Sequence, residues 1–276
     1  MTVHGHREVT TYPQETESSY PGQSSLGQME RDMSEVLEGA ACGIDGCAPV
    51  ALDHFVPASG VIATLAIEVI SDAICPWCWI AKRRLDSAIA AIAPDVTASI
   101  TWRPFELNPE MPKGGVDRRA YRSAKFGSWQ HSRALDAQVA AAGRSEGLVF
   151  NHDKMERTPN TIDAHRLIRL AGQEAKQTEI VEGLFAAYFN EGRDIGDPTV
   201  LADIGASTGL DHARIVAMLA SDEGQAQVRS EVQRTVNLRL SGVPTVLVDG
   251  VPLFSGAIRA DLMEAPLRTA ADHARS

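Results

Sequence analysis

Ile74-Cys75-Pro76-Trp77-Cys78-Trp79 stands between a run that predicts a strand and a run that predicts a helix. The preceding run, Leu65–Ile70, is apolar and rich in β-branched residues, as expected of a buried strand. The following run, Ile80–Ile89, has apolar residues at the spacing of a helix with one buried face. Pro76 suits the first helical position, because the N–H that proline lacks has no partner there. The two cysteines are therefore expected where a strand turns into a helix.

This junction predicts different roles for the two thiols. The Cys75 sulfur is expected at the helix N-terminus, where unpaired N–H groups and the helix dipole stabilise a thiolate, which is the reactive form. We therefore expect the pKa of Cys75 to lie below the usual value of about 8.5. Cys78 lies one turn further on, less exposed and close enough to form a disulfide with Cys75. A C-x-x-C pair in this context is typical of a redox motif.

Two other interpretations of the C-x-x-C pair are half of a zinc site and two inert thiols. Zinc needs four ligands, and the part of the chain after residue 60 has no second cysteine pair. The strand–helix context favours the redox interpretation over both.

Acidic residues are concentrated at the N-terminal end. Of the net charge of −10, residues 1–60 carry −7 and residues 61–276 carry −3, and this distribution does not indicate a nucleic-acid partner. No run of 18 apolar residues predicts a membrane span, and the first thirty residues lack the apolar core of a secretory signal. We therefore expect a cytoplasmic protein with neither nucleic acid nor membrane as partner.

Residues 1–60 are predicted to form a disordered acidic tail, because they begin with a polar stretch that has no periodicity. The tail contains a C-x4-C pair, Cys42 and Cys47. This pair has three interpretations: unpaired thiols on a tail, an accessory redox pair, or part of a metal site with His54. A further alternative is that the protein binds a metal or a partner through all four cysteines. This would require the tail to fold over the helix N-terminus. We predict no metal site.

The rest of the chain predicts one α/β domain that is interrupted in its middle. A second strand at Val96–Arg103 completes a strand–helix–strand unit, which implies parallel pairing. Residues 116–240 predict about five helices, and the first of them, Val116–Glu146, begins with an arginine-rich run. That run is either a solvated face or a site for an acidic peptide or thiol.

After the helices, Thr245–Val248 and Val251–Ser255 are predicted to be strands that a tight Asp249-Gly250 turn joins into a hairpin. A final helix follows the hairpin. The tail is predicted to cover residues 1–60. The α/β domain is predicted to consist of residues 61–115 and 241–276, with the helical insertion at residues 116–240 between its two parts.

Gly242-Val243-Pro244-Thr245 predicts the second half of the site, just before the hairpin. A proline is tolerated at a strand start and allows a cis peptide bond, which would turn the Val243 backbone toward an open face. Exposed backbone groups beside a thiol suit an extended peptide or glutathione, which can pair as an added strand. The alternative is a plain proline at a strand start, and the C-x-x-C motif favours the site.

The chain resembles the DsbA-like thioredoxin-fold family in three features. These are the Cys75–Cys78 motif after a strand, the helical insertion and the Gly242–Thr245 turn. Ser71–Cys78, Phe105-Glu106-Leu107-Asn108-Pro109 and Asn160–Leu167 are similar to its FrnE-like branch of dithiol–disulfide isomerases. The resemblance covers about residues 62–267. It implies a thioredoxin-like fold with an inserted all-helical domain, and thiol–disulfide exchange.

On the family's pattern, Cys75 is the nucleophile, Cys78 the resolving thiol and Pro244 the cis proline. Trp77 stands where periplasmic DsbA has a histidine, so we expect a less oxidising pair than in that protein. The tail with Cys42 and Cys47 lies outside the matched part.

Five residues are predicted to contact the substrate: Trp77, Asn160, His165, Val243 and Pro244. Each has an alternative structural role, because a tryptophan beside a cysteine is often a packing residue and a helical histidine often caps a neighbour. The functional interpretation requires the insertion to cover the active site.

The predicted substrate is a disulfide-containing protein or a small thiol. No bound cofactor is expected, and glutathione or a thioredoxin-type protein is a candidate electron donor. The competing function is that of a glutathione-dependent transferase or 2-hydroxychromene-2-carboxylate isomerase, which the same fold resembles. Those enzymes orient glutathione with a serine where this chain has Cys75, and only thiol exchange accounts for both Cys75 and Cys78. No oligomeric state is predicted.

Overall fold

A four-stranded mixed sheet lies at the centre of residues 63–275, the part of the chain that the computed structural model describes. Its strand order is β2-β1-β5-β6. β1 pairs parallel with β2 and antiparallel with β5, and β5 pairs antiparallel with β6. The bounds are Ala63–Ser71 for β1, Val96–Pro104 for β2, Thr245–Val248 for β5 and Val251–Ser255 for β6.

The first half of the sheet is the predicted strand–helix–strand unit. Leu65, Ile67 and Val69 are buried at alternate positions of β1, as a strand that packs against a core requires. Helix α1, Pro76–Ile92, makes the crossover to β2. The thioredoxin-like α/β fold with an insertion is confirmed by this unit and the C-terminal hairpin.

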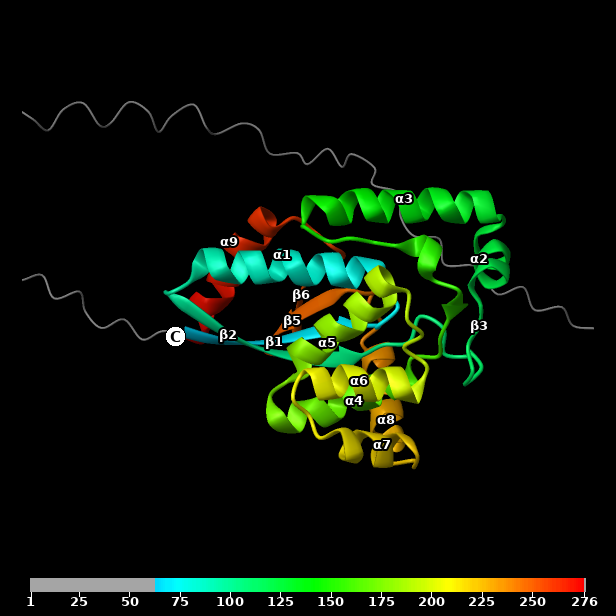
Figure 1. The fold of residues 1–276 in the computed structure, drawn as a ribbon. Helices are drawn as coiled ribbons and strands as arrows, with labels where there is room; N and C mark the ends of the chain where they lie inside the picture. The colour runs from blue at the N-terminus through cyan, green and yellow to red at the C-terminus, as the bar shows by residue number, and fades with distance from the viewer. Residues whose placement is uncertain (1–62, 276) are drawn as a thin grey trace, which may run out of the picture. The chain divides into compact units, whose positions relative to one another are not determined.

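The hairpin turns at Asp249 and Gly250, as predicted. Both residues have a positive φ, 51° and 78°, which a two-residue turn of type I′ requires. The hairpin leads into α9, Ala260–Ala274. Helices α1 and α9 lie above the sheet in Figure 1, and most of the insertion lies below it and to its right.

The insertion differs from the prediction, because it contains more helices and is not all-helical. Its α-helices are α2 Arg118–Phe126, α3 Trp129–Ser145, α4 Ile162–Ala171, α5 Gln177–Phe185, α6 Pro198–Ser207, α7 His212–Leu219 and α8 Gln225–Asn237. Shorter turns lie at η1 His152–Lys154 and η2 Gly172–Glu174, and a π-helical segment, η3, at Ala186–Glu191. A two-stranded ribbon pairs β3, Val116–Asp117, with β4, Arg157–Thr158.

The single helix predicted over residues 116–146 is wrong. Gly127 has a φ of 83° and ends α2, and the hydroxyl of Ser128 accepts a hydrogen bond from the N–H of His131 and caps α3. The first two residues of the predicted helix instead form β3, since Val116 pairs with Thr158.

The insertion is fixed to the sheet by both apolar and polar contacts. Its buried residues join those of the sheet in one hydrophobic core. At β2, Trp102 Nε1 donates to the Thr178 hydroxyl of α5 (3.1 Å), and the Thr235 hydroxyl of α8 donates to the Pro104 carbonyl (2.9 Å). The insertion and the sheet therefore share one interior.

The predictions for residues 1–60, including the roles of Cys42 and Cys47, lie outside the described residues. Between residues 63 and 275, no helix is both long and apolar enough to cross a membrane.

Candidate redox site

Cys75 and Cys78 lie at the N-terminus of α1, as predicted. Cys75 is the N-cap residue and Pro76 occupies the first helical position. The N–H of Cys75 donates to the Asp72 carbonyl (2.9 Å), and the N–H of Cys78 donates to the Cys75 carbonyl (3.1 Å). Both thiols are free.

Both thiols are buried, which overturns the prediction of a low pKa at Cys75. Cys75 is 2 % exposed and Cys78 is 1 % exposed. Burial raises the pKa of Cys75 well above its usual value, and the neighbouring Cys78 thiol acts in the same direction. The N–H of Cys78 lowers the pKa of Cys75, which is the effect expected of a helix N-terminus, but burial outweighs it.

The turn before β5 covers the Cys75 sulfur. The Val243 carbonyl oxygen lies 3.8 Å from Cys75 Sγ and accepts a hydrogen bond from the thiol. The Val243–Pro244 peptide bond is cis, as predicted, and both residues are buried. The structure thus brings Val243 and Pro244 to the cysteines across more than 160 residues of sequence, although the Val243 carbonyl faces the thiol rather than an open surface.

Asp72 is a buried carboxylate that sequence reasoning did not single out, and it holds this turn. Asp72 Oδ2 accepts a hydrogen bond from the N–H of Leu107 (2.7 Å), and Oδ1 accepts a longer one from the N–H of Ile74 (3.4 Å). Its negative charge also raises the pKa of Cys75. The sequence signal that could have identified Asp72 is an acidic residue between two apolar stretches, directly before the cysteines.

Residues 66–268 match the family of the DSBA-like thioredoxin domain. The chain belongs to this family. The match covers both halves of the sheet and the insertion between them, so the family assignment rests on the whole of the fold.

Two known proteins are similar to the chain over most of its length. An uncharacterized protein of Bacillus subtilis (strain 168), YwbO, is 28% identical over 202 residues, which are 73% of this chain and 94% of YwbO. The probable DsbA oxidoreductase SCO1869 from Streptomyces coelicolor is also 28% identical. Its crystal structure matches with a TM-score of 0.68 over 75% of this chain and 89% of that one.

A third protein is similar to this chain in its fold alone. The cytosolic disulfide reductase DsbM from Pseudomonas aeruginosa is 18% identical, with a TM-score of 0.52 over 76% of this chain and 97% of DsbM. DsbM has also been determined with GSH.

Trp77 of this DSBA-like chain lies between the two cysteines in the first turn of α1, where it is half-buried and packs against the core. Its role as a substrate contact stays a prediction. The following Trp79 is buried and packs edge-on against Phe150, with ring centroids 5.1 Å apart.

Asn160 and His165 are engaged within the chain. Asn160 Nδ2 donates to the Met111 carbonyl (2.8 Å), and its Oδ1 accepts from the N–H of Ile162 at the start of α4. His165 is buried, with Nε2 3.0 Å from the Phe105 carbonyl oxygen and 3.6 Å from Asp72 Oδ1. These contacts favour the structural interpretation of both residues, and substrate contact stays a prediction.

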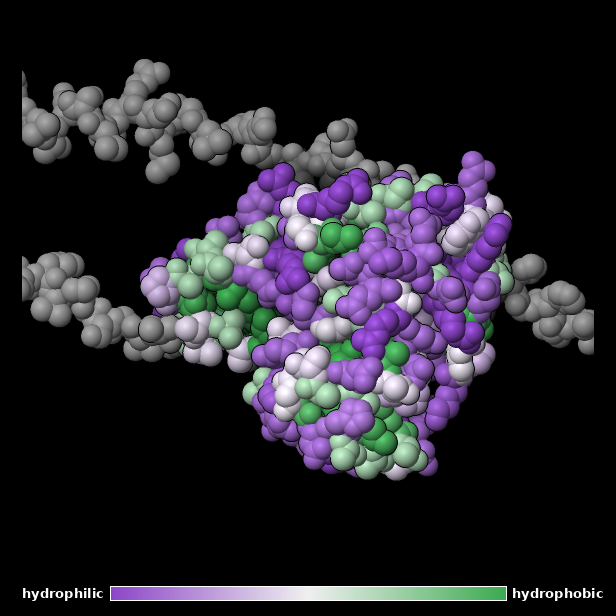
Figure 2. Space-filling model, in the orientation of Figure 1, coloured by the Kyte–Doolittle hydropathy of each residue, from purple (hydrophilic) through white to green (hydrophobic). Residues whose placement is uncertain are grey.

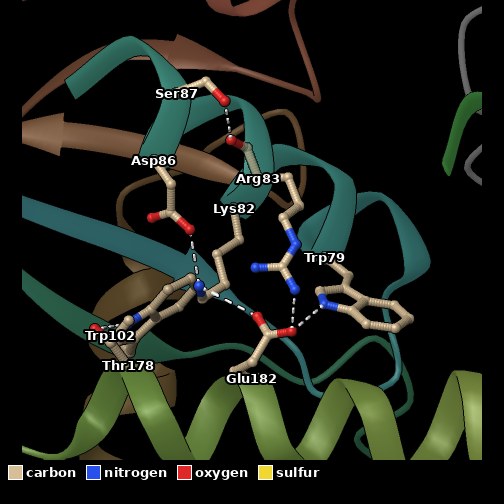
Figure 3. Close-up of polar contacts among 8 residues, drawn as sticks. All are labelled: Trp79, Lys82, Arg83, Asp86, Ser87, Trp102, Thr178 and Glu182. Carbon is tan, nitrogen blue, oxygen red and sulfur yellow. Dashed lines mark hydrogen bonds and ion pairs between the residues drawn. The ribbon is translucent and has the colours of Figure 1, made fainter. Parts of the chain in front are cut away.

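A polar cluster between α1 and α5 was also missed from the sequence (Figure 3). Glu182 Oε1 accepts hydrogen bonds from Trp79 Nε1 (3.1 Å) and from Arg83. Lys82 Nζ, on a side chain that is only 6% exposed, lies 3.2 Å from Glu182 Oε2 and 2.9 Å from Asp86 Oδ2. The insertion thereby holds the helix that begins with the two cysteines.

No group of three or more His, Cys, Asp or Glu side chains between residues 63 and 275 is arranged to hold a metal ion.

Proposed function

We propose that this DSBA-like protein is a thiol–disulfide oxidoreductase and isomerase of the FrnE-like branch, with Cys75 as nucleophile and Cys78 as resolving thiol. The supporting observation is the pair of free thiols one turn apart at the start of α1, with Cys75 against the Val243 carbonyl. Disulfide exchange accounts for both thiols, whereas the transfer of glutathione needs only one hydroxyl or thiol at this place.

In the reductive direction, Cys75 loses its proton and attacks one sulfur of the substrate disulfide. The substrate S–S bond breaks, a mixed disulfide with Cys75 forms, and the released substrate thiolate takes up a proton. Cys78 then loses its proton and attacks the Cys75 sulfur, which frees the second substrate thiol and leaves a Cys75–Cys78 disulfide. Two electrons have passed from the protein to the substrate. In isomerisation, a substrate thiol attacks the mixed disulfide instead, and no net transfer occurs.

The oxidised pair needs a dithiol or two molecules of a monothiol to return to the reduced state. We assign this role to glutathione or to a thioredoxin-type protein. The structure of DsbM with GSH, and the name of that protein as a cytosolic disulfide reductase, support glutathione and a cytoplasmic location. Disulfide-containing proteins or small disulfides are the proposed substrates.

The Cys75→Ser variant tests this function. The full chain and the variant are assayed for reduction of insulin with dithiothreitol, for refolding of scrambled ribonuclease, and for conjugation of glutathione to an aryl halide. We expect the two disulfide activities to disappear in Cys75→Ser, since a serine cannot form the mixed disulfide. Cys78→Ser serves as the matched control, because it should still trap substrate on Cys75. Conjugation by both wild type and Cys75→Ser, without any disulfide activity, would instead establish the glutathione transferase.

A further inference from the structure

A cavity lies away from the thiols, between the first half of α3 and the η1 turn. It has a volume of about 360 Å³, within the range of small-molecule sites. Cationic side chains of Arg118, Arg133 and Lys154 line it, together with the rings of Trp129, Phe150 and His152. Figure 2 shows hydrophilic residues gathered at the α2 and β3 side of the molecule.

The floor of this cavity holds more buried positive than negative charge. The Arg118 side chain is 3% exposed, and its Nη2 lies 2.7 Å from Asp136 Oδ2. Arg122 Nη2 contacts the other oxygen of the same carboxylate at 2.8 Å. Two guanidinium groups thus share one carboxylate. A guanidinium keeps its proton in proteins, so an anion bound in the cavity would balance the remaining positive charge.

His152 adds no positive charge that could balance an anion. Burial lowers the pKa of His152 to about 4, and Arg118 and Arg122 act in the same direction. Its ring stacks on that of Phe150, with centroids 5.5 Å apart. At neutral pH these two rings form an uncharged aromatic wall.

The rim of the cavity carries further unbalanced cations. Arg133 and Lys154 are exposed, and neither forms an ion pair with another residue in the range 63–275. Asp153 is the carboxylate that lines the rim beside them. With Arg122 included, four cations face two carboxylates, Asp136 and Asp153, which leaves two positive charges.

We propose that this cavity binds a small organic dianion with an apolar or aromatic body. One anionic group lies against Arg118 at the floor, the other lies between Arg133 and Lys154 at the rim, and the body packs against the rings of Trp129 and Phe150. In a dicarboxylate, two carboxylates supply these two groups; in a phosphate monoester, one phosphate carries both charges and its oxygens face Arg118 and the rim cations. The site is separate from the thiols, because neither Cys75 nor Cys78 lines the cavity, and it does not depend on the proposed redox function.

Calorimetric titration of the full chain at low salt tests this site with four probes. Phthalate and phenyl phosphate carry two charges at pH 8, benzoate carries one and benzamide none. We expect at least one dianion to bind with a dissociation constant of about 1 mM or lower, and benzoate to bind about tenfold more weakly. Tighter binding of phthalate identifies a dicarboxylate site, and tighter binding of phenyl phosphate a phosphate-ester site.

The variant Arg133→Ala/Lys154→Ala changes exposed side chains only and should fold normally. We expect it to bind the preferred dianion about tenfold more weakly. Arg144→Ala, which removes the same charge from an exposed position of α3 outside the cavity, is the matched control and should bind as wild type does. The proposal is overturned if neither dianion binds at about 10 mM, or if benzamide binds as well as they do. Equal affinity of the double variant and wild type would also overturn it.

Discussion

The thiol of Cys75 and the guanidinium of Arg118 are both buried, but burial has opposite consequences for their charges. A thiol becomes neutral when water is removed, so burial at Cys75 raises the pKa and leaves no unbalanced charge. A guanidinium cannot do this, so burial at Arg118 leaves a charge that Asp136, which also pairs with Arg122, only partly balances. Burial therefore keeps the Cys75 thiol protonated but leaves the arginines charged.

Asp136→Asn is expected to cause the largest loss in the free energy of unfolding, and it tests whether the charges around Arg118 are buried. The variant leaves two guanidinium groups at the cavity floor without a carboxylate, and removing one partner of a buried ion pair costs about 3–5 kcal/mol. Urea denaturation followed by circular dichroism measures the loss. Asp153→Asn, at an exposed position of the same cavity, should change the free energy of unfolding by less than about 0.5 kcal/mol. Equal effects of the two variants would show that the floor is not a buried charge site.

The cluster at Glu182 offers a balanced counterpart, because Lys82 and Arg83 there face two carboxylates, Glu182 and Asp86 (Figure 3). Glu182→Gln keeps an acceptor for the indole of Trp79 but removes one charge. Since Glu182 and Arg83 are partly exposed, we expect a loss of about 1–2 kcal/mol in the free energy of unfolding, smaller than at Asp136.

Glu179→Gln, at an exposed position of the same helix, is the control for this variant, and we expect no measurable change. Urea denaturation of both proteins makes the measurement. A loss at Glu182 as large as the loss at Asp136 would show that balance of charge does not decide the cost of burial here.

The thiol side of the comparison is tested by the pH dependence of alkylation. Because the pKa of Cys75 is raised, its thiolate fraction at neutral pH lies below that of a free cysteine, and the fraction continues to rise above the usual thiol pKa of about 8.5. Iodoacetamide labelling of the reduced chain, with mass spectrometry of the Cys75 peptide, should show a rate that still increases in that range. The same chain in urea should level off earlier. A native profile that is already level at neutral pH contradicts the raised pKa.

The smallest effect is expected from Asp72→Asn in the same alkylation experiment. The carboxylate of Asp72 raises the pKa of Cys75, so its removal should move the profile of the native chain toward lower pH. The amide oxygen of asparagine can still accept the hydrogen bond from Leu107. An unchanged profile, with the fold intact, would show that burial alone sets the pKa.

The sequence predicted the elements whose signals are local. Pro76 marks the start of α1, Asp249 and Gly250 make the hairpin turn, and β-branched runs mark the strands. The position of Val243 and Pro244 beside Cys75 was predicted from a proline at a strand start together with the C-x-x-C motif, and the family resemblance agreed with it.

The burial of Cys75 was not predicted, because the Val243 backbone was expected to face an open surface, whereas its carbonyl faces the thiol across 168 positions of sequence. The shared carboxylate of Asp136 was hidden for a similar reason. The arginine-rich run looked continuous, and only the break at Gly127 folds α2 against α3, so that Arg118 and Arg122 meet Asp136. Short-range patterns give the elements, but the charges that end up buried together depend on how the elements pack.

The long separation between β1 and β5 has a consequence for the newly made chain. Val243 lies 165 residues after Cys78, so at about 5–20 residues per second the ribosome needs on the order of ten seconds or more to synthesise the segment between them. During that interval the emerging thiols lack the turn that covers Cys75 in the finished structure. A nascent chain therefore presents its cysteines to cellular oxidants and electrophiles before it can shield them.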